Sequence, residues 1–355
     1  MNESGVYPTM SAPASPLLDP GTSPLDVRQR AVVQRVSDAE RAHVLALPSN
    51  DPLDPKLHSR VEATGPELFG QPAAIQATLQ LNTSTLDEIA DRLTAGVRRV
   101  VLVGCGDSLA VMIAARQTLE SMLGVPCEPM QSLEFAYYHA NLVDTGTAVV
   151  ALSSSGETTR TVEALLLAQH RRSYTVALTN TAGSTLQSEA DTSLEIKATR
   201  VGWPTQSSTA ALALLLELAI RVGERRVPTT AAPLREAFDE VPDVMAGVLS
   251  RIDPLIAKIA EDEVEAGVHT VLFSGGGPNL AAMKSRAEAT SPASSSSLAG
   301  GSSGSGGTLA ACAPGFTPAC GIESGGRGFG ASAFSTARLA HTSTVKPFRE
   351  TRARW

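Results

Sequence analysis

Three short clusters of Ser, Thr and Gly stand between apolar stretches of the sequence. They read GCGDS at Gly104–Ser108, SSSGETT at Ser153–Thr159 and TQSST at Thr205–Thr209. These residue types have little intrinsic preference for the interior of a strand or helix, so local stability does not account for them. Their hydroxyl and backbone N–H groups can donate hydrogen bonds to an anion without a fixed positive charge. The clusters therefore predict a phosphate-type anion site, and helix capping is the alternative for any one cluster alone.

The apolar stretches around the clusters predict the strands of a parallel sheet. Short runs such as RRVVLVGCG and TAVVALS alternate with helix-length segments such as SLAVMIAARQTLESMLG. This alternation predicts an α/β fold, a five-stranded parallel sheet flanked by helices. In such a sheet, ligands bind outside the carboxyl ends of the strands, and the three clusters fall there. Residues 65–96 predict two helices with a break at Asn82–Ser84, and residues 132–142 predict one helix.

The motifs, taken in their order along the chain, resemble a known family. GCGDS, SSSGETTRT, TNTAGSTLQSEAD and a QSST loop before an apolar helix are similar to the sugar isomerase (SIS) family. Within the family, the likeness is to the double-domain type of the isomerase half of glucosamine-fructose-6-phosphate aminotransferase and of related sugar-phosphate isomerases and deaminases. It covers roughly residues 65–279. The resemblance implies a flavodoxin-like three-layer fold that binds a phosphosugar, a small molecule, at the strand ends.

The resemblance also implies roles for residues of the three clusters. Carried over by position, the candidate substrate-binding residues are Ser108, Ser153, Ser154, Ser155, Thr158 and Ser207. Ser207 would contact the sugar, and the others except Ser154 would hold the phosphate. Ser154 stands where the aminotransferases usually have Gln, so its role is the least defined of the six.

The catalytic residues of the family have no counterpart in this sequence. In the active relatives a general-base Glu, a ring-opening His and a Lys come from the second domain or after it. Glu288, Glu323 and His341 are present here, but their surroundings match nothing in the family. Isomerisation needs both a base and an acid, and serines alone cannot supply both. The catalytic residues therefore stay unknown, and we expect no cofactor and no metal.

Five segments are predicted along the chain. They are a disordered leader and helix (1–50), a first SIS domain (51–226), a helical linker (227–268), the start of a second SIS domain (269–284) and a low-complexity tail (285–355). HTVLFSGGGPN at His269–Asn279 imitates the first strand and its turn, but Gly and Ser dominate after about Met283. The tail is either naturally disordered or the product of a reading-frame change, which would explain why the second domain lacks its remaining strands.

Composition limits the location and the partners. The net charge of -7 gives no broad attraction to nucleic acid or to an anionic membrane, and no apolar run reaches the roughly 18 residues of a spanning helix. The N-terminus shows no secretion signal and four scattered cysteines form no metal pattern, which predicts a cytoplasmic protein. Long apolar helices such as Ala210–Val222 predict a homodimer, since family members pair through such helices.

Several functions remain open at this point. The sequence predicts a sugar-phosphate aldose–ketose isomerase or an amino-sugar-phosphate deaminase, inactive or weak as written. Transfer of ammonia from glutamine is not expected, because the chain starts Met1-Asn2-Glu3 instead of with a catalytic cysteine. One alternative is a non-enzymatic sugar-phosphate sensor or regulator. A less favoured one is a dinucleotide-binding protein. GCGDSL is a partial G-x-G-x-x-G with Leu109 in place of the third glycine, and Glu128 is expected near the end of the next strand, where such a fold would hold a ribose.

Overall fold

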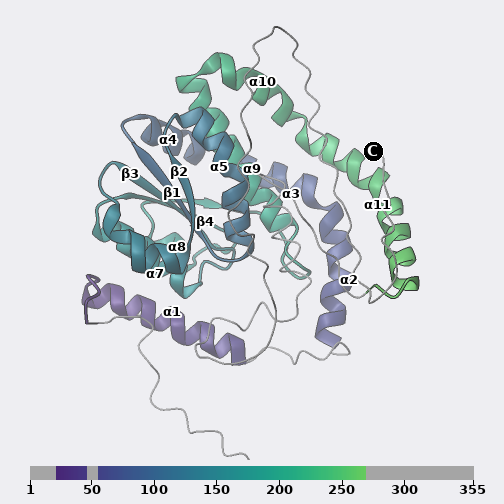
Figure 1. Ribbon diagram of the computed structural model, residues 1–355, viewed down its shortest axis with the longest axis horizontal. Helices are drawn as coiled ribbons and strands as arrows, with labels where there is room; N and C mark the ends of the chain where they lie inside the picture. The colour runs from purple at the N-terminus through teal and green to yellow at the C-terminus, as the bar shows by residue number, and fades with distance from the viewer. Residues whose placement is uncertain (1–20, 46–54, 269–355) are drawn as a thin grey trace, which may run out of the picture.

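Five parallel strands form the centre of the computed structural model, which describes residues 21–45 and 55–268 (Figure 1). They are β1 (Arg99–Gly104), β2 (Cys127–Gln131), β3 (Thr147–Leu152), β4 (Tyr174–Thr179) and β5 (Thr192–Glu195). Their order across the sheet is β2-β1-β3-β4-β5, the flavodoxin-like order. The predicted five-stranded parallel sheet flanked by helices is confirmed. The predicted start of a second domain (269–284) and the tail (285–355) lie outside the described residues.

The strand register brings the polar clusters together. All six residues of β3 are buried, as its apolar TAVVAL sequence requires of a central parallel strand. Gly104 at the end of β1 lies opposite Leu152 at the end of β3, and Leu152 lies opposite Leu178 of β4. Because these strands end at the same level, the turns after β1 and β3 leave the sheet next to each other. The sheet therefore positions the GCGDS and SSSGETT segments on one edge.

Helices cover both faces of the sheet (Figure 1). The longer ones are α1 (Val27–Leu45), α2 (Pro55–Phe69), α3 (Gln71–Leu81), α4 (Thr83–Thr94), α5 (Asp107–Leu123), α7 (Thr159–His170), α9 (Gln206–Arg226), α10 (Pro228–Asp239) and α11 (Val241–Glu265). One apolar cluster joins the sheet to α4, α5 and α9 through residues such as Leu93, Met112 and Leu214. A second joins the opposite face to α1, α7 and α8 (Thr185–Glu189) through Val36, Leu165 and Leu186.

The segment after β2 is not the single helix that the sequence predicts. It consists of α6 (Ser132–Glu134), a π-helical turn η1 (Phe135–His139) and a 3₁₀ turn η2 (Ala140–Leu142). The Gln131 side chain starts it by accepting hydrogen bonds from the backbone N–H groups of Leu133 and Glu134. Phe135 is fully buried against the sheet, whereas Tyr138 is exposed.

The N-terminal helix α1 is attached to the helix that follows the serine-rich loop. The Glu40 carboxylate accepts hydrogen bonds from the backbone N–H and the hydroxyl of Thr159, the first residue of α7. Arg35 donates to the Thr185 hydroxyl at the start of α8 over 2.8 Å. A carboxylate at a helix N-terminus is favourable because free N–H groups point at it. These hydrogen bonds thus attach α1 to the N-termini of α7 and α8.

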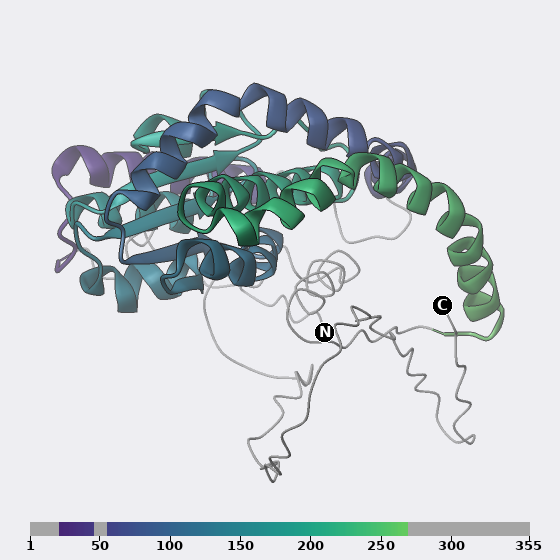
Figure 2. The ribbon, with the colours of Figure 1, turned by 90° about the horizontal axis from the view of Figure 1, so that it is seen from above.

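Of the two helices that follow α9, α10 packs on α9 and α11 packs on α3. Phe238 of α10 joins Ile75 of α3 and Ile220 of α9 in a small third cluster. Figure 2 shows α11 extending beyond the sheet, and Leu255 and Ile256 in its second half are about half exposed. Within residues 21–45 and 55–268, no helix combines the length and the apolar character needed to cross a membrane.

Candidate functional site

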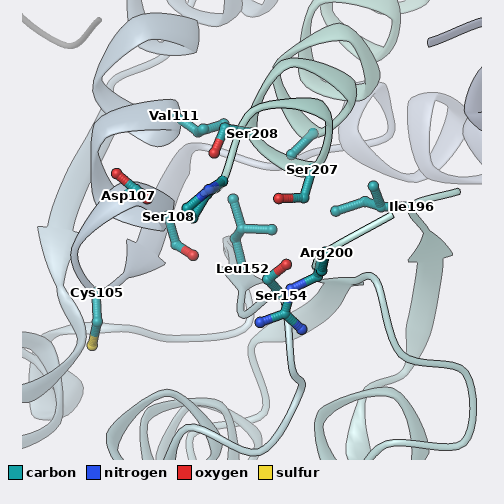
Figure 3. Close-up of a pocket in the computed structure, with 12 residues that line it drawn as sticks. Cys105, Asp107, Ser108, Val111, Leu152, Ser154, Ile196, Arg200, Ser207 and Ser208 are labelled. Atoms are coloured by element: carbon teal, nitrogen blue, oxygen red, sulfur yellow. The ribbon is translucent and has the colours of Figure 1, made fainter. Parts of the chain in front are cut away.

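A pocket of about 140 Å³ lies at the carboxyl ends of β1, β3 and β5 (Figure 3). Both polar and apolar side chains line the pocket. They are Cys105, Asp107, Ser108, Val111, Leu152, Ser154, Ile196, Arg200, Pro204, Ser207, Ser208 and Ala211. One water molecule needs only about 10–15 Å³ of such volume, so the pocket has room for part of a small organic molecule. Its place at the strand ends is the one that open parallel sheets use for ligands.

Three of the predicted residues, one from each cluster, come together in this pocket. Ser108 is in the first turn of α5, Ser154 follows β3, and Ser207 is in the first turn of α9. In Figure 3 the Ser108 and Ser207 hydroxyl groups point into the pocket from opposite sides of Leu152. The three clusters, far apart in the sequence, therefore supply one site.

The hydroxyl side chains of the other three predicted residues form a separate cluster in the loop after β3. The Ser153 Oγ atom lies 2.9 Å from the Thr158 hydroxyl and 3.4 Å from the Ser155 hydroxyl. Ser153 also accepts a hydrogen bond from the backbone N–H of Gly156 over 3.1 Å. These side chains lie together, but they are not among the residues that line the 140 Å³ pocket. The structure thus divides the six candidates into two adjacent groups.

A glycine in the same loop allows its close approach to the next turn of the sheet. Gly156 has φ +66, and a Cβ atom there would lie 2.1 Å from the Ser184 Oγ atom and 2.3 Å from the Ser184 Cβ atom. Both the left-handed backbone and the lack of space require glycine. The turn between β4 and α8 therefore packs directly on the serine-rich loop.

Arg200 is a pocket residue that the sequence analysis missed. It lies in the loop between β5 and α9 and lines the pocket with Ser154 and Ser207. The residue as a whole is exposed, but partial desolvation lowers the pKa of Arg200, and the nearby positive charge of Arg60 lowers it further. The predicted site had no fixed positive charge, and the structure supplies one. Its position just before the TQSST cluster was the available signal, but the sequence does not show which way an arginine in a loop points.

The two described cysteines have different surroundings. Cys105 lines the pocket, and its Sγ atom lies 3.8 Å from the Thr161 hydroxyl. Burial raises the pKa of Cys127 to about 12, so this thiol stays protonated. Among the described residues, no three His, Cys, Asp or Glu side chains are grouped to hold a metal ion. Glu288, Glu323 and His341 lie outside the described ranges.

Replacing Ser154 with alanine should weaken ligand binding without destabilising the fold. The Ser154 Oγ atom is buried and has no hydrogen-bond partner among the described residues. Since an unpaired buried hydroxyl is unfavourable, its removal is expected to leave the free energy of unfolding unchanged or to raise it by about 1 kcal/mol. Urea unfolding and ligand calorimetry on S154A measure the two effects. Lower stability together with unchanged affinity would show that this hydroxyl is structural.

The comparisons with known proteins agree with this architecture. Residues 95–221 match the SIS domain family. The chain is 34% identical over 225 residues to the glutamine–fructose-6-phosphate aminotransferase (isomerizing) of Photorhabdus laumondii, covering 59% of this chain and 36% of that protein. The Aquifex aeolicus enzyme of the same name is 33% identical over 197 residues, covering 55% and 32%. The chain thus spans about a third of the length of the curated relatives it matches.

A solved structure shares the fold. The C-terminal domain of the Francisella tularensis glucosamine-fructose-6-phosphate aminotransferase matches with a TM-score of 0.50 at 23% identity, over 56% of this chain and 58% of that one. The matched family segment begins just before β1 and ends inside α9, so it contains the whole sheet and both groups of hydroxyl residues. Residues 95–221 of this chain are a SIS domain.

Proposed function

We propose that this chain binds a phosphorylated sugar at the carboxyl ends of β1 and β3. The observation that carries the proposal is the convergence of Ser108, Ser154 and Ser207 in one pocket. The cluster of hydroxyl side chains in the loop after β3 lies beside it. Hydroxyl donors and helix N-termini suit a phosphate, and the pocket next to them suits the rest of a sugar. The related aminotransferases, whose name includes fructose 6-phosphate, support this ligand class.

The reaction that we propose is an aldose–ketose isomerisation or an amino-sugar-phosphate deamination. Both reactions move a proton next to a carbonyl or imine carbon and need a positioned base. We assign no residue to that role. A sensor that binds the ligand without turnover is the second candidate, and a pocket in which three hydroxyl side chains converge favours it, because hydroxyls bind better than they abstract protons. Turnover of fructose 6-phosphate or glucosamine 6-phosphate distinguishes the two.

The double variant S153A/S155A should bind hexose 6-phosphates at least tenfold more weakly than the wild type. It removes two hydroxyl donors, each worth about 1.5–3 kcal/mol toward a charged acceptor. Isothermal titration calorimetry with fructose 6-phosphate measures the loss. S250A, on the exposed part of α11, is the matched control and should bind normally.

The single variant S155A separates binding from loop structure. It keeps the Ser153 bond to the Gly156 N–H and removes the 3.2 Å bond that the Ser155 Oγ atom accepts from the Glu157 N–H, so most of the turn is retained while one donor to the ligand is lost. We expect S155A to melt at nearly the wild-type temperature and to show part of the loss in affinity. Equal affinity of wild type and double variant would contradict the phosphate role of this loop. The homodimer and the cytoplasmic location remain predictions.

A further inference from the structure

Arg200 places a positive charge in the pocket that no anion of the described chain neutralises. Its side chain lines the pocket with Ser154 and Ser207, and in the described part of the chain it makes no ion pair or hydrogen bond. Arg200 is exposed to solvent, so its guanidinium is free to pair with an anion that enters the pocket. A site that keeps such a group is suited to receive an anion from outside.

The neighbouring charges do not satisfy Arg200. Arg60 of α2 lies over the Trp203 ring, with its guanidinium carbon 4.2 Å from the ring centre, and adds a second positive charge. The Glu67 carboxylate, also on α2, accepts hydrogen bonds from the backbone N–H groups of Val201 and Gly202 over 2.7 and 3.2 Å. Its oxygens therefore hold the loop that carries Arg200. Asp107 lines the pocket from α5, on the other side of the Ser108 side chain in Figure 3.

Arg200 lines the pocket, whereas three of the residues proposed to hold the phosphate lie outside its lining. Ser153, Ser155 and Thr158 bond to one another in the loop after β3, outside the pocket lining, whereas Arg200 lies in the pocket with Ser207. A phosphate held by the serine-rich loop leaves the guanidinium facing the remainder of the sugar. A ligand whose only charge is its phosphate would leave Arg200 unpaired.

We propose that the ligand is a phosphorylated sugar that carries a carboxylate, and that Arg200 binds this carboxylate. The inference rests on the proposed function, because it assumes that the phosphate lies at the serine-rich loop. A single guanidinium matches one carboxylate with two parallel hydrogen bonds. A second phosphate would bring about two negative charges into a pocket of about 140 Å³ whose walls include Leu152, Ile196 and Pro204. The carboxylate is the better match in charge and size.

Two linear ligands that differ in one group test the proposal on the full chain. Glucitol 6-phosphate carries a hydroxymethyl group where 6-phosphogluconate carries a carboxylate. We expect the wild type to bind 6-phosphogluconate about tenfold to a hundredfold more tightly, the range of a charge-assisted hydrogen bond. R200Q should lose this preference and still bind glucitol 6-phosphate, and R200K should keep part of it. R251Q, an exposed arginine of α11, controls for the change in net charge and should keep the full preference.

Each other result has a definite meaning. If R200Q binds both ligands more weakly by the same factor, Arg200 holds the phosphate, and the inference is wrong while the proposed function stands. Equal affinity of the wild type for the two ligands, or a preference that survives in R200Q, also overturns the inference alone. If neither ligand nor fructose 6-phosphate binds the wild type, the proposed function fails and the inference fails with it. Thermal melting of R200Q shows whether the variant is folded.

Discussion

Replacing Gly156 with alanine is expected to lower the free energy of unfolding by about 2–5 kcal/mol and to weaken phosphosugar binding. The left-handed backbone at φ +66 costs a non-glycine residue about 1–2 kcal/mol. The added Cβ atom would also meet Ser184 at 2.1–2.3 Å, and overpacking typically costs about 1–3 kcal/mol more. The loop after β3 must move away from Ser184 to relieve this clash, and the movement displaces the hydroxyl groups of Ser153 and Ser155.

Gly183 offers a matched control for this experiment. It has a similar φ of +73, but nothing lies within 4 Å of the Cβ atom that alanine would add. G183A should therefore lose only the 1–2 kcal/mol of backbone strain. Urea unfolding measures both variants, and calorimetry with fructose 6-phosphate measures binding. If G156A is no less stable than G183A, the contact between the two turns is not rigid, and the packing argument is wrong.

Replacing Glu217 with alanine is expected to destabilise the fold by about 1.5–3 kcal/mol, the range for lost hydrogen bonds to a charged group. Glu217 is buried in α9 and accepts hydrogen bonds from Arg221 over 2.6 Å and from Arg235 of α10 over 2.6 and 3.2 Å. Burial lowers the pKa of Arg235, but the hydrogen bonds that Arg235 donates to the Glu217 and Glu224 carboxylates outweigh this effect, so the net shift is upward. Removing the shared carboxylate deletes these charge-assisted hydrogen bonds and leaves Arg221 with Asp87, and Arg235 with Glu224 and Asp239, all of which are more exposed than Glu217.

Glu224 is the matched control for Glu217. It also binds Arg235, over 2.8 Å, but its side chain is 41% exposed, so water replaces the lost contact. E224A should cost no more than about 1 kcal/mol. Chemical unfolding monitored by circular dichroism compares the variants. Similar losses for E217A and E224A would mean that burial of the Glu217 carboxylate does not matter. We expect α10 to separate from α9 first in E217A, and amide hydrogen exchange in α10 reports this.

The sheet was predictable because its signal is local. The apolar runs of β1 and β3 are short and bounded by glycine or serine, and such runs are strands in this setting. The break at Asn82 was predictable for the same reason. The break at Gly70 was not, because its cause lies far away in the chain: a Cβ atom at Gly70 would lie 2.4 Å from the Nε2 atom of Gln206 in α9.

The site was predictable only in part, for a related reason. Residue type and order identified Ser108, Ser154 and Ser207, but only the fold shows that they share a pocket without Ser153, Ser155 and Thr158. The direction of the Arg200 side chain depends on how the loop is held by Glu67, which is a tertiary contact. The long apolar helix α9 led to the prediction of a dimer. Within the chain, α3, α4, α5 and α10 pack around α9, and these contacts account for its apolar residues.

The strand order also determines when the strands can pair during folding. β1 pairs with β3 in parallel, and α5, β2, α6, η1 and η2 lie between them in the chain. The two central strands can therefore meet only after a long loop closes, which makes this pairing slower than a hairpin. Until then the apolar runs of β1 and β3 are unpaired and can associate with other chains. Refolding yield should for this reason fall as the protein concentration rises, even where the folded protein is stable.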